Sequence, residues 1–326
     1  MINQAFQKNR LKNGFLRVSF TYSLLTSFFF YIIKDKFKSG VFHMEKLKIL
    51  LPKGRIYQNV IALLSGAGIK VDLPERAYRP TVNQDDLEAK VMKPQNIGKL
   101  LELGSHDVGF TGRDWIQETN ADVEEIMDLG FDKVRIVAAV PNALDDKTLA
   151  ERKVIVATEY EQIARRWLES RKQEFLIVRT YGATEVFPPD DADMIIDNTA
   201  TGRTLMENGL RIVDTILTSS TCMFASKKAL QDPAKKQKIM ELKMLFEAVL
   251  DARDRVMLEM NCTKEKFDAL VKGIPAMRSP TVSPLYGDNG YAIKIAVKKG
   301  DVPTLLPRLR ELGATDILEY ELRKVL

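Results

Sequence analysis

Short apolar runs alternate with amphipathic segments along most of this chain of 326 residues. The first apolar run, 47–51, is typical of a buried strand, and the next segment repeats apolar residues at helical spacing before Gly68. The alternation continues with strands expected at 107–110, 134–140, 154–158, 175–180, 192–197, 211–217 and 223–226. Strands that alternate with helices form a parallel or mixed sheet with helices outside it. The pattern therefore predicts an α/β fold.

The last part of the chain has its own order of elements. Helices expected at 263–271 and 301–312 are interspersed among strands expected at 256–260, 281–285, 291–298 and 316–320. Within 291–298 hydrophobic residues alternate with Lys and Ala, which indicates a strand buried on one face. The order β-α-β-β-α-β is the ferredoxin-like arrangement. We therefore expect a small module of regulatory type, joined to a larger body.

Cysteine and histidine are scarce. The chain has Cys222 and Cys262, too few for a disulfide framework or a cysteine-ligated metal site, so a reducing cytosol is the expected compartment. His43 and His106 are the only histidines, which excludes a centre built from several histidines. Catalysis must therefore come from Lys, Arg, Asp, Glu and Thr side chains and from backbone amides.

The net charge of +5 comes from the first 43 residues, which hold seven basic side chains and one acidic one. The remainder has 42 basic and 43 acidic residues, so its composition does not indicate nucleic-acid binding. The uncharged run 18–33 is shorter than the roughly 20 apolar residues that span a bilayer. We interpret 1–43 as an upstream extension outside the working protein, with translation starting at Met44. A signal anchor is the alternative.

The segment 192–209 carries the strongest indication of a binding site. An expected strand ends at Asp197, a Thr- and Gly-containing loop follows, and a helix begins near Arg203. Such a turn presents unpaired N–H groups, and Gly202 lets a ligand approach the backbone, which together suit a phosphate monoester. Hydroxyl donors are added by Thr199, Thr201 and Thr204. Asp197 is placed to accept hydrogen bonds from sugar hydroxyls. The alternative is an ordinary capped turn.

Two further loops follow the same rule. Lys53 and Arg55 come directly after the first strand, and Arg113 and Asp114 come after the strand at 107–110. Cations beside a helix start suit a polyanion, although loop cations are also commonly just solvated. Glu185 follows a turn and could face the same cleft. Three strand-to-helix loops of this composition together favour a binding cleft over solvated turns.

In these motifs the chain closely resembles the ATP phosphoribosyltransferase family in its long form, the first enzyme of histidine biosynthesis. The resemblance covers 46–326, and residues 1–43 have no counterpart in it. The motifs that carry it, in agreeing order and spacing, are LPKGR (51–55), DVGFTGRDW (107–115), DLGFDKVRIVAAVP (128–141), GATEVFP (182–188), DNTATGRTLMENGL (197–210), SPTVSPL (279–285) and GATDIL (313–318).

The resemblance implies that N1 of ATP attacks C1′ of phosphoribosyl pyrophosphate and releases pyrophosphate, with Mg²⁺ present. It implies catalytic roles for Lys53, Arg55 and Asp197, with no side-chain ligand set for the metal. Phosphoribosyl pyrophosphate would be bound by Asp197, Glu185, Ala200, Thr201, Gly202, Arg203 and Thr204. ATP would be bound by Lys53, Gly54, Arg55, Lys93, Arg113 and Asp114. Lys93 replaces the usual Arg and Asn96 the usual Asp, which weakens the transfer of those contacts.

The resemblance also implies an organisation. Two lobes similar to periplasmic binding proteins, 44–133 with 227–254 and 134–226, would bracket the active cleft, and 255–326 would be the ferredoxin-like regulatory domain. Inhibitory histidine would contact Asn261, Met277, Thr281 and Asp316. Asn261 stands where an acid is expected to meet the amino group of histidine. A cytoplasmic homo-oligomer, from dimer to hexamer, is expected to act without nucleic acid and without a separate regulatory subunit.

Two other functions remain open from the sequence. A two-lobed solute-binding protein would bind its ligand without turnover, and the anchor-like leader suits it. A phosphoribosyltransferase that acts on another base would share the loop after Asp197. Competition by adenine nucleotides distinguishes the second alternative from transfer to ATP.

Overall fold

The computed structural model describes residues 45–74, 77–145, 147, 149, 151–277 and 279–326. Our interpretation of 1–43 as an extension or an anchor lies outside the described residues. Internal contacts separate Met1–Glu45 from one larger unit, Lys46–Leu326. Within the described part, each helix is too short or too polar to cross a bilayer.

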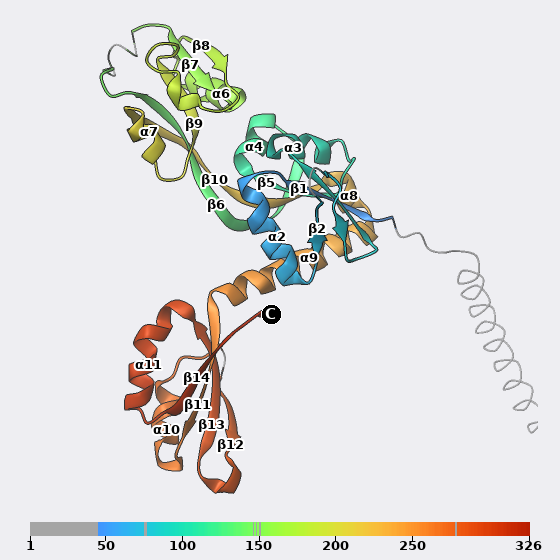
Figure 1. Cartoon of the computed structure of the whole chain (residues 1–326), viewed down its shortest axis with the longest axis vertical. Helices are drawn as coiled ribbons and strands as arrows, with labels where there is room; N and C mark the ends of the chain where they lie inside the picture. Colours follow the sequence, from blue (N-terminus) through green and yellow to red (C-terminus); the bar gives the residue numbers. More distant parts are fainter. Residues whose placement is uncertain (1–44, 75–76, 146, 148, 150, 278) are drawn as a thin grey trace, which may run out of the picture. The chain divides into compact units, whose positions relative to one another are not determined.

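A mixed sheet of eight strands forms the body and confirms the predicted α/β class (Figure 1). From edge to edge it consists of β4 (Leu87–Met92), β1 (Leu47–Pro52), β5 (Val108–Gly112), β10 (Leu210–Ser226), β6 (Val123–Pro141), β9 (Met194–Thr199), β7 (Val154–Thr158) and β8 (Phe175–Arg179). β1 pairs in parallel with β4 and β5, and β7 pairs in parallel with β8 and β9. The antiparallel strands β6 and β10 join these two parallel groups.

The joining strands are longer than the sequence pattern predicted. β10 is one strand of 17 residues, so the expected separation into 211–217 and 223–226 is wrong. The polar run between them, 218–222, looks like a break in the sequence, but Ser219 and Ser220 are buried with their hydroxyls hydrogen-bonded to Asp114 and Asp128. β6 likewise begins before the expected 134–140 and pairs with β10 from Val123 to Pro141, with several register shifts.

Two groups of helices cover the two halves of the sheet. The first half carries α2 (Arg55–Ala67), α3 (Pro94–Glu102), α4 (Arg113–Thr119), α8 (Lys227–Gln231) and α9 (Pro233–Arg253), with a small β2–β3 hairpin (Val71–Asp72, Thr81–Val82). The second half carries α6 (Glu161–Ser170), η1 (Thr184–Val186) and α7 (Arg203–Glu207).

Each half has its own hydrophobic core. Helix α9 packs on the first core, with the rings of Phe246 and Phe110 edge to face at 5.9 Å. Ile163 and Leu168 of α6 pack on the second core. Strand β10 contributes to both cores. Its Met223 belongs to the first core, and its Leu217 packs against the second.

The C-terminal part forms a separate four-stranded antiparallel sheet. Its elements are β11 (Arg255–Cys262), α10 (Lys264–Gly273), β12 (Thr281–Pro284), η2 (Tyr286–Asp288), β13 (Tyr291–Lys298), η3 (Lys299–Asp301), α11 (Val302–Glu311) and β14 (Thr315–Glu321). The strand order is β12-β13-β11-β14. The structure thus confirms the predicted β-α-β-β-α-β sequence of elements, with an apolar core of its own.

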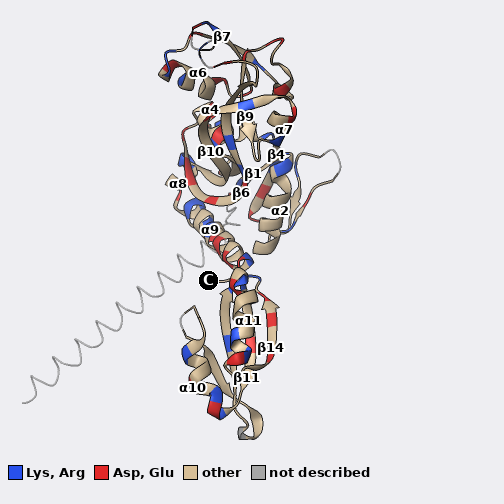
Figure 2. Ribbon diagram, turned by 90° about the vertical axis from the view of Figure 1, so that its left-hand side faces the viewer, with Lys and Arg blue, Asp and Glu red and all other residues tan. Residues whose placement is uncertain are grey.

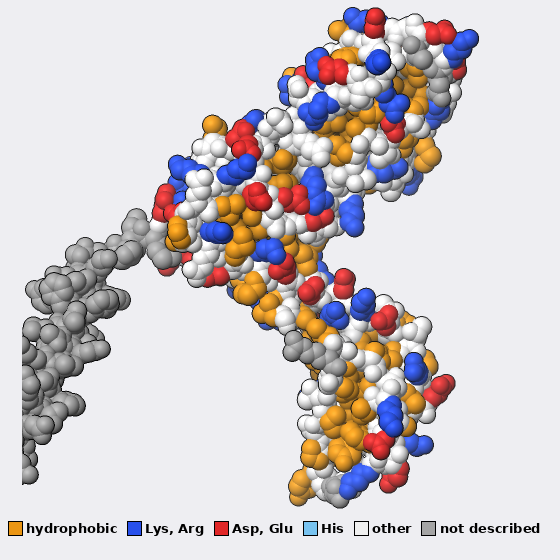
Figure 3. All heavy atoms as spheres, turned by 180° about the vertical axis from the view of Figure 1, so that it is seen from behind, with side chains coloured by type: hydrophobic (Ala, Val, Ile, Leu, Met, Phe, Trp, Pro, Cys, Tyr) orange, Lys and Arg blue, Asp and Glu red, His pale blue; other side chains and the backbone are white. Residues whose placement is uncertain are grey.

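Basic and acidic side chains are mixed over the elements of the larger unit (Figure 2). The face shown in Figure 3 likewise carries acidic and basic groups close together. This distribution agrees with the near-balance of charge that the sequence gives for 44–326.

Candidate active site

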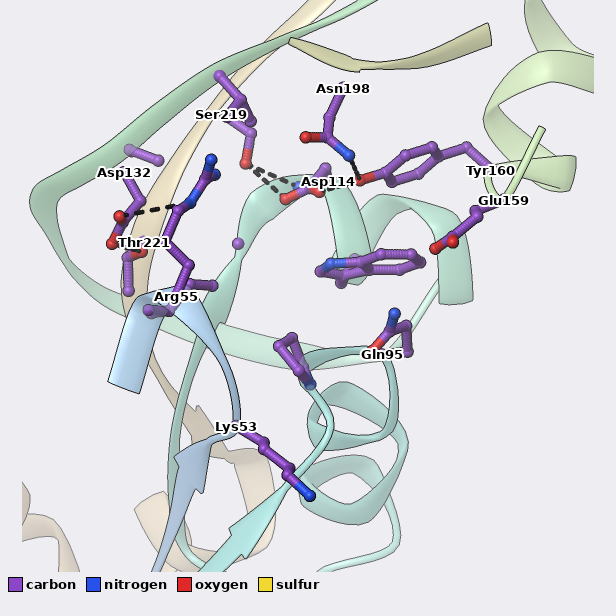
Figure 4. A pocket seen from close by; sticks show the side chains of 16 residues that line it. Lys53, Arg55, Gln95, Asp114, Asp132, Glu159, Tyr160, Asn198, Ser219 and Thr221 are labelled. Carbon is purple, nitrogen blue, oxygen red and sulfur yellow. Dashed lines mark hydrogen bonds and ion pairs between the residues drawn. The ribbon is translucent and has the colours of Figure 1, made fainter. Parts of the chain in front are cut away.

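A cavity of about 320 Å³ lies where the two halves of the sheet meet (Figure 4). Its lining comes from both halves, because strand ends and helix starts converge there. The first half supplies Lys53, Arg55, Gln95, Asp114 and Trp115, the second Glu159, Tyr160 and Asn198, and the joining strands Asp132, Ser219 and Thr221. Of the residues predicted for ATP, the cavity therefore brings together Lys53, Arg55 and Asp114.

Asp114 is the most firmly held group of this cavity. Its side chain lies in the first turn of α4, and the residue is only 5% exposed. The hydroxyls of Tyr160 and Ser219 donate to its two carboxylate oxygens at 2.9 and 2.7 Å. A Cβ atom at Gly112 would lie 2.0 Å from Asp114 Oδ1, so the preceding strand must end in glycine for this carboxylate to fit.

Tyr160 connects the two halves of the cavity wall. Its ring stacks on Trp115 with the centroids 4.6 Å apart, and its hydroxyl accepts a hydrogen bond from Asn198 Nδ2 at 3.2 Å. Burial and the neighbouring Asp114 carboxylate raise the pKa of Tyr160. The phenol therefore stays protonated and donates to Asp114, while Asn198 donates to the phenol.

Gln95 offers the cavity an unused acceptor. Among the described residues, its buried Oε1 atom has no hydrogen-bond partner. The residue lies in the first turn of α3, Figure 4 places it near Glu159, and Trp115 lines the same cavity. A buried acceptor without a partner is costly, so a ligand that donates an N–H there would remove the cost.

The predicted cations divide among different surroundings. Lys53 and Lys93 follow the paired strand ends Pro52 and Met92, which places them at one edge of the sheet. The Lys53 ammonium donates to the Tyr78 hydroxyl at 3.4 Å and lies 5.2 Å from the centre of that ring. Lys93 is exposed and does not line the cavity.

The two arginines of the expected ATP site both have carboxylate partners. Arg55 Nε lies 3.7 Å from a carboxylate oxygen of Asp132, whose side chain is only 10% exposed. Arg113 donates from Nε to Glu125 at 2.8 Å and from Nη1 to Asp128 at 3.1 Å. These bonds raise the pKa of Arg113. Its side chain lines a neighbouring cavity, so the adjacent residues 113 and 114 line different cavities.

Asp197 lies next to Asn198 near the end of β9, and the strand continues two residues beyond the predicted end, to Thr199, because Asn198 and Thr199 still pair with β6. The pKa of Asp197 is raised to about 6, mainly by burial. Hydrogen bonds from the Asn198 N–H and the Thr184 hydroxyl act in the opposite direction and lower the pKa. The charges of Glu159 and Glu185 raise it further, so Glu185 does lie near Asp197, as expected. This carboxylate changes its charge near neutral pH and would be anionic above about pH 6.

The loop after Asp197 has the predicted strand-to-helix turn. Gly202 adopts φ +80° at the start of α7, a conformation that favours glycine. Its N–H donates to Thr199 Oγ1 at 2.9 Å, and the Arg203 N–H donates to Thr201 Oγ1 at 3.3 Å. Exposed residues of the loop are Ala200, Thr201, Arg203 and Thr204. The loop is therefore open to a ligand, with two of its amides bonded to threonine hydroxyls.

The structure does not bring this loop onto the same cavity as Lys53. Within 197–204, Asn198 lines the cavity of Asp114, and Ala200 lines the neighbouring one. We expected the loop of Lys53 and Arg55 to share one cavity with the phosphate loop. Of the residues 197–204, only Asn198 lines the cavity that contains Lys53 and Arg55.

Sequence reasoning missed Tyr160, Glu159 and Gln95 as parts of the site. Glu159 and Tyr160 directly follow β7, and Gln95 lies in the first turn of the helix after β4. The search for polar residues after strand ends that singled out Lys53 and Asp114 could therefore have found them. Asn198 stood inside a recognised motif without a role of its own.

In the C-terminal sheet the structure brings two of the four expected histidine contacts together. Asn261 Nδ2 donates to Asp316 Oδ2 at 3.1 Å, and the Thr315 hydroxyl donates to the same oxygen at 3.0 Å. Met277 and Thr281 are both exposed. Thr281 pairs with Lys294 of β13, the strand that separates β12 from β11.

Comparisons with known proteins agree on one family. Residues 93–248 match the family described as ATP phosphoribosyltransferase, and 252–324 match the one described as HisG, C-terminal domain. ATP phosphoribosyltransferases from Chlorobium phaeovibrioides and Pelodictyon phaeoclathratiforme are 40% and 39% identical, over 86% of this chain and 97% and 98% of theirs.

A solved structure is also similar. The ATP phosphoribosyl transferase (HisG:HisZ) complex from Thermotoga maritima contains a chain that is 26% identical to this one, with a TM-score of 0.56. The match covers 62% of this chain and 98% of that one. These likenesses favour a transferase over the solute-binding alternative.

Proposed function

The chain belongs to the ATP phosphoribosyltransferase family, and from that premise we propose how its own residues bind the substrates and carry the reaction. The enzyme transfers the phosphoribosyl group of phosphoribosyl pyrophosphate to N1 of ATP, which gives phosphoribosyl-ATP and pyrophosphate. This is the first step of L-histidine biosynthesis.

The adenine of ATP binds in the cavity beside Asp114. The observation that carries this assignment is the unpartnered Gln95 Oε1 atom beside a stacked Trp115 and Tyr160 pair. Adenine offers a flat ring for the aromatic wall and an exocyclic amino group for the Gln95 acceptor. The Asp114–Tyr160–Asn198 chain keeps this wall in place before the substrate arrives.

The phosphoribosyl group binds at Asp197 and the loop after it. Asp197 accepts hydrogen bonds from the ribose hydroxyls, and Glu185 lies beside it. The amides and hydroxyls of 200–204 hold the 5′-phosphate, because this turn is exposed and begins a helix. Adenine N1 carries a lone pair, so the reaction needs positioning and neutralisation of the leaving group more than a strong base. Lys53 and Arg55 supply positive charge there.

Mg²⁺ accompanies the diphosphate. In the described parts of the chain no cluster of three or more His, Cys, Asp or Glu side chains could hold a metal ion. Pyrophosphate oxygens and waters can complete most of an octahedral shell, which fits a site with few protein ligands. When bound, the ion would neutralise charge on the leaving group.

The finer features of the organisation belong to the same proposal. Separate cores in the two halves of the large sheet support two lobes of the periplasmic-binding-protein kind, with the boundaries stated above. The β-α-β-β-α-β order of 255–326 supports a ferredoxin-like regulatory domain. We assign to the enzyme a cytoplasmic location and assembly as a dimer or hexamer without a separate regulatory subunit.

Histidine inhibits the enzyme at the C-terminal sheet. The match to the HisG C-terminal domain supports this assignment, and Asp316 supplies a carboxylate where Asn261 lacks one. Replacing Asn261→Asp should lower the histidine concentration for half-inhibition about tenfold, because a second carboxylate meets the amino group. An unchanged value would remove Asn261 from the effector site.

The activity is tested directly by mixing ATP, phosphoribosyl pyrophosphate and Mg²⁺ with the full chain. Modification of the adenine ring at N1 should give a new ultraviolet absorbance, accompanied by release of pyrophosphate. Replacing ATP with other purine or pyrimidine nucleotides should give no product. Folded protein that produces neither signal would contradict the assignment.

A further inference from the structure

A second cavity, of about 410 Å³, adjoins the one that holds Asp114. The two cavities share Val134, Ser219 and Ser220, so they meet at the joining strands β6 and β10. The second cavity is also lined by Ala200, the first residue after β9. It therefore adjoins both the proposed adenine cavity and the proposed phosphate loop.

Three cations line this second cavity, and they differ in whether they are neutralised. Arg113 is bonded to Glu125 and Asp128. Although Asp128 is partly buried, hydrogen bonds from Ser220 and the Gly130 N–H, together with Arg113, hold its pKa below the usual value, so it is anionic and engaged. By contrast, Lys133 and Arg135 have no carboxylate within ion-pair distance among the residues described. The cavity wall thus has an excess of positive charge.

Two other cations of this region are paired with carboxylates. Arg55 has Asp132 as a partner, and Arg203 donates to Glu207 at 2.7 Å. A cation that lies in a hollow without a carboxylate partner binds an anionic ligand more readily, since no carboxylate competes for its hydrogen-bond donors.

The fold places Arg135 directly beside the phosphate loop. In the β6–β9 ladder Arg135 is the partner of Thr199, whose hydroxyl holds the Gly202 N–H at the start of α7. Directly paired residues in a ladder project on the same face, about 5 Å apart at Cβ. Arg135 therefore lies within reach of a substrate that occupies the loop.

We propose that the second cavity binds the oligophosphate chain of a substrate, with Lys133 and Arg135 as its ligands. This inference rests on the proposed function, because both substrates carry such a chain: the triphosphate of ATP and the diphosphate of phosphoribosyl pyrophosphate. Arg135 presents a fork that matches two phosphate oxygens, and Lys133 adds a point charge. Neither residue takes part in the contacts assigned above to adenine, to ribose or to the 5′-phosphate.

The test uses Lys133→Ala, Arg135→Ala and Arg135→Lys in the full chain. Calorimetric titrations with ATP, phosphoribosyl pyrophosphate and inorganic pyrophosphate give the affinities. Each Ala variant should weaken the binding of pyrophosphate and of one substrate about tenfold, the effect of one lost charge-assisted hydrogen bond. Arg135→Lys should retain part of the affinity. Lys153→Ala, which removes an exposed cation at the far end of β7, should leave all three affinities unchanged.

The affected substrate identifies the source of the chain. Weaker ATP binding alone assigns the cavity to the triphosphate, and weaker phosphoribosyl pyrophosphate binding alone assigns it to the diphosphate. Unchanged affinity for every ligand in Lys133→Ala, Arg135→Ala and Arg135→Lys overturns the proposal. Turnover by the unmodified chain tests the proposed function separately. If the enzyme is active but its ligand affinities are unchanged by these substitutions, the proposed phosphate site is refuted and the proposed function is not. Circular dichroism checks that each variant is folded.

Discussion

The wall around Asp114 and the loop after Asp197 are built in opposite ways, although both follow a strand end. The carboxylate of Asp114 is buried and accepts two hydroxyls, and the partner hydroxyl of Tyr160 is itself bonded to Asn198. The loop 200–204 is largely exposed, and two threonine hydroxyls from within the motif hold its turn.

The difference indicates where each site obtains its order. A satisfied buried network is formed during folding and costs nothing when the substrate binds, whereas an exposed turn gains its remaining contacts from the ligand. We therefore expect substitutions in the Asp114 wall to change stability as well as activity. Substitutions in the loop should change the affinity for phosphoribosyl pyrophosphate and leave stability nearly unaltered.

Asp114→Ala should give the largest effect. It leaves the hydroxyls of Tyr160 and Ser219 without their buried acceptor, so the free energy of unfolding should fall by about 3 kcal/mol, and the KM for ATP should rise. Urea denaturation followed by circular dichroism measures the loss. The matched control is Asp122→Ala, an exposed acid in an ion pair with Lys227, which should cost less than about 1 kcal/mol. If both substitutions lowered the free energy of unfolding equally, the buried hydrogen bonds of Asp114 would contribute no more to stability than an exposed ion pair.

Asp197→Asn should act mainly on binding. An anionic Asp197 accepts the ribose hydroxyls more strongly than a neutral amide, so the KM for phosphoribosyl pyrophosphate at pH 8 should rise about thirtyfold. Because the pKa of Asp197 is about 6, wild-type affinity should be full above that pH and fall as the pH drops through it. The substrate phosphate titrates in the same range, and this contribution is common to both proteins.

The ratio of the two KM values therefore isolates Asp197. It should be large at pH 8 and approach one near pH 5, where the carboxyl of the wild type is protonated. A ratio that stays constant over this pH range would mean that the effect of the substitution does not come from the charge of Asp197.

The same contrast explains what could be predicted from the sequence. The α/β class, the β-α-β-β-α-β module and the positions of Lys53, Asp114 and Asp197 at or near strand ends follow from local apolar periodicity and loop composition, which a single sequence displays. The two hydrogen bonds that hold the turn after Asp197 join residues two and three apart, so the turn itself could be predicted from the composition of the loop.

The wall around Asp114 was not predictable in this way, since its partners are distant in the sequence. Ser219 is separated from Asp114 by 105 residues and Tyr160 by 46, and both approach only when the joining strands pair. The same long-range pairing hid the continuity of β10, because buried hydroxyls at Ser219 and Ser220 resemble a loop in the sequence. It also turned Arg113 toward Glu125 and away from the cavity of its neighbour Asp114.

Arg203→Ala should change stability and KM least of the three substitutions, because Arg203 lies in the exposed loop. The Arg203 side chain is 80% exposed and donates to Glu207 in the next turn, an arrangement worth only a few tenths of a kcal/mol to folding. Unfolding should therefore be unchanged, whereas the KM for phosphoribosyl pyrophosphate should rise about fivefold through one lost, solvent-screened phosphate contact. Glu207→Ala serves as the control, because it frees Arg203 from its partner and should lower the same KM slightly. A KM that responds to neither substitution would place the 5′-phosphate on the loop amides and hydroxyls alone.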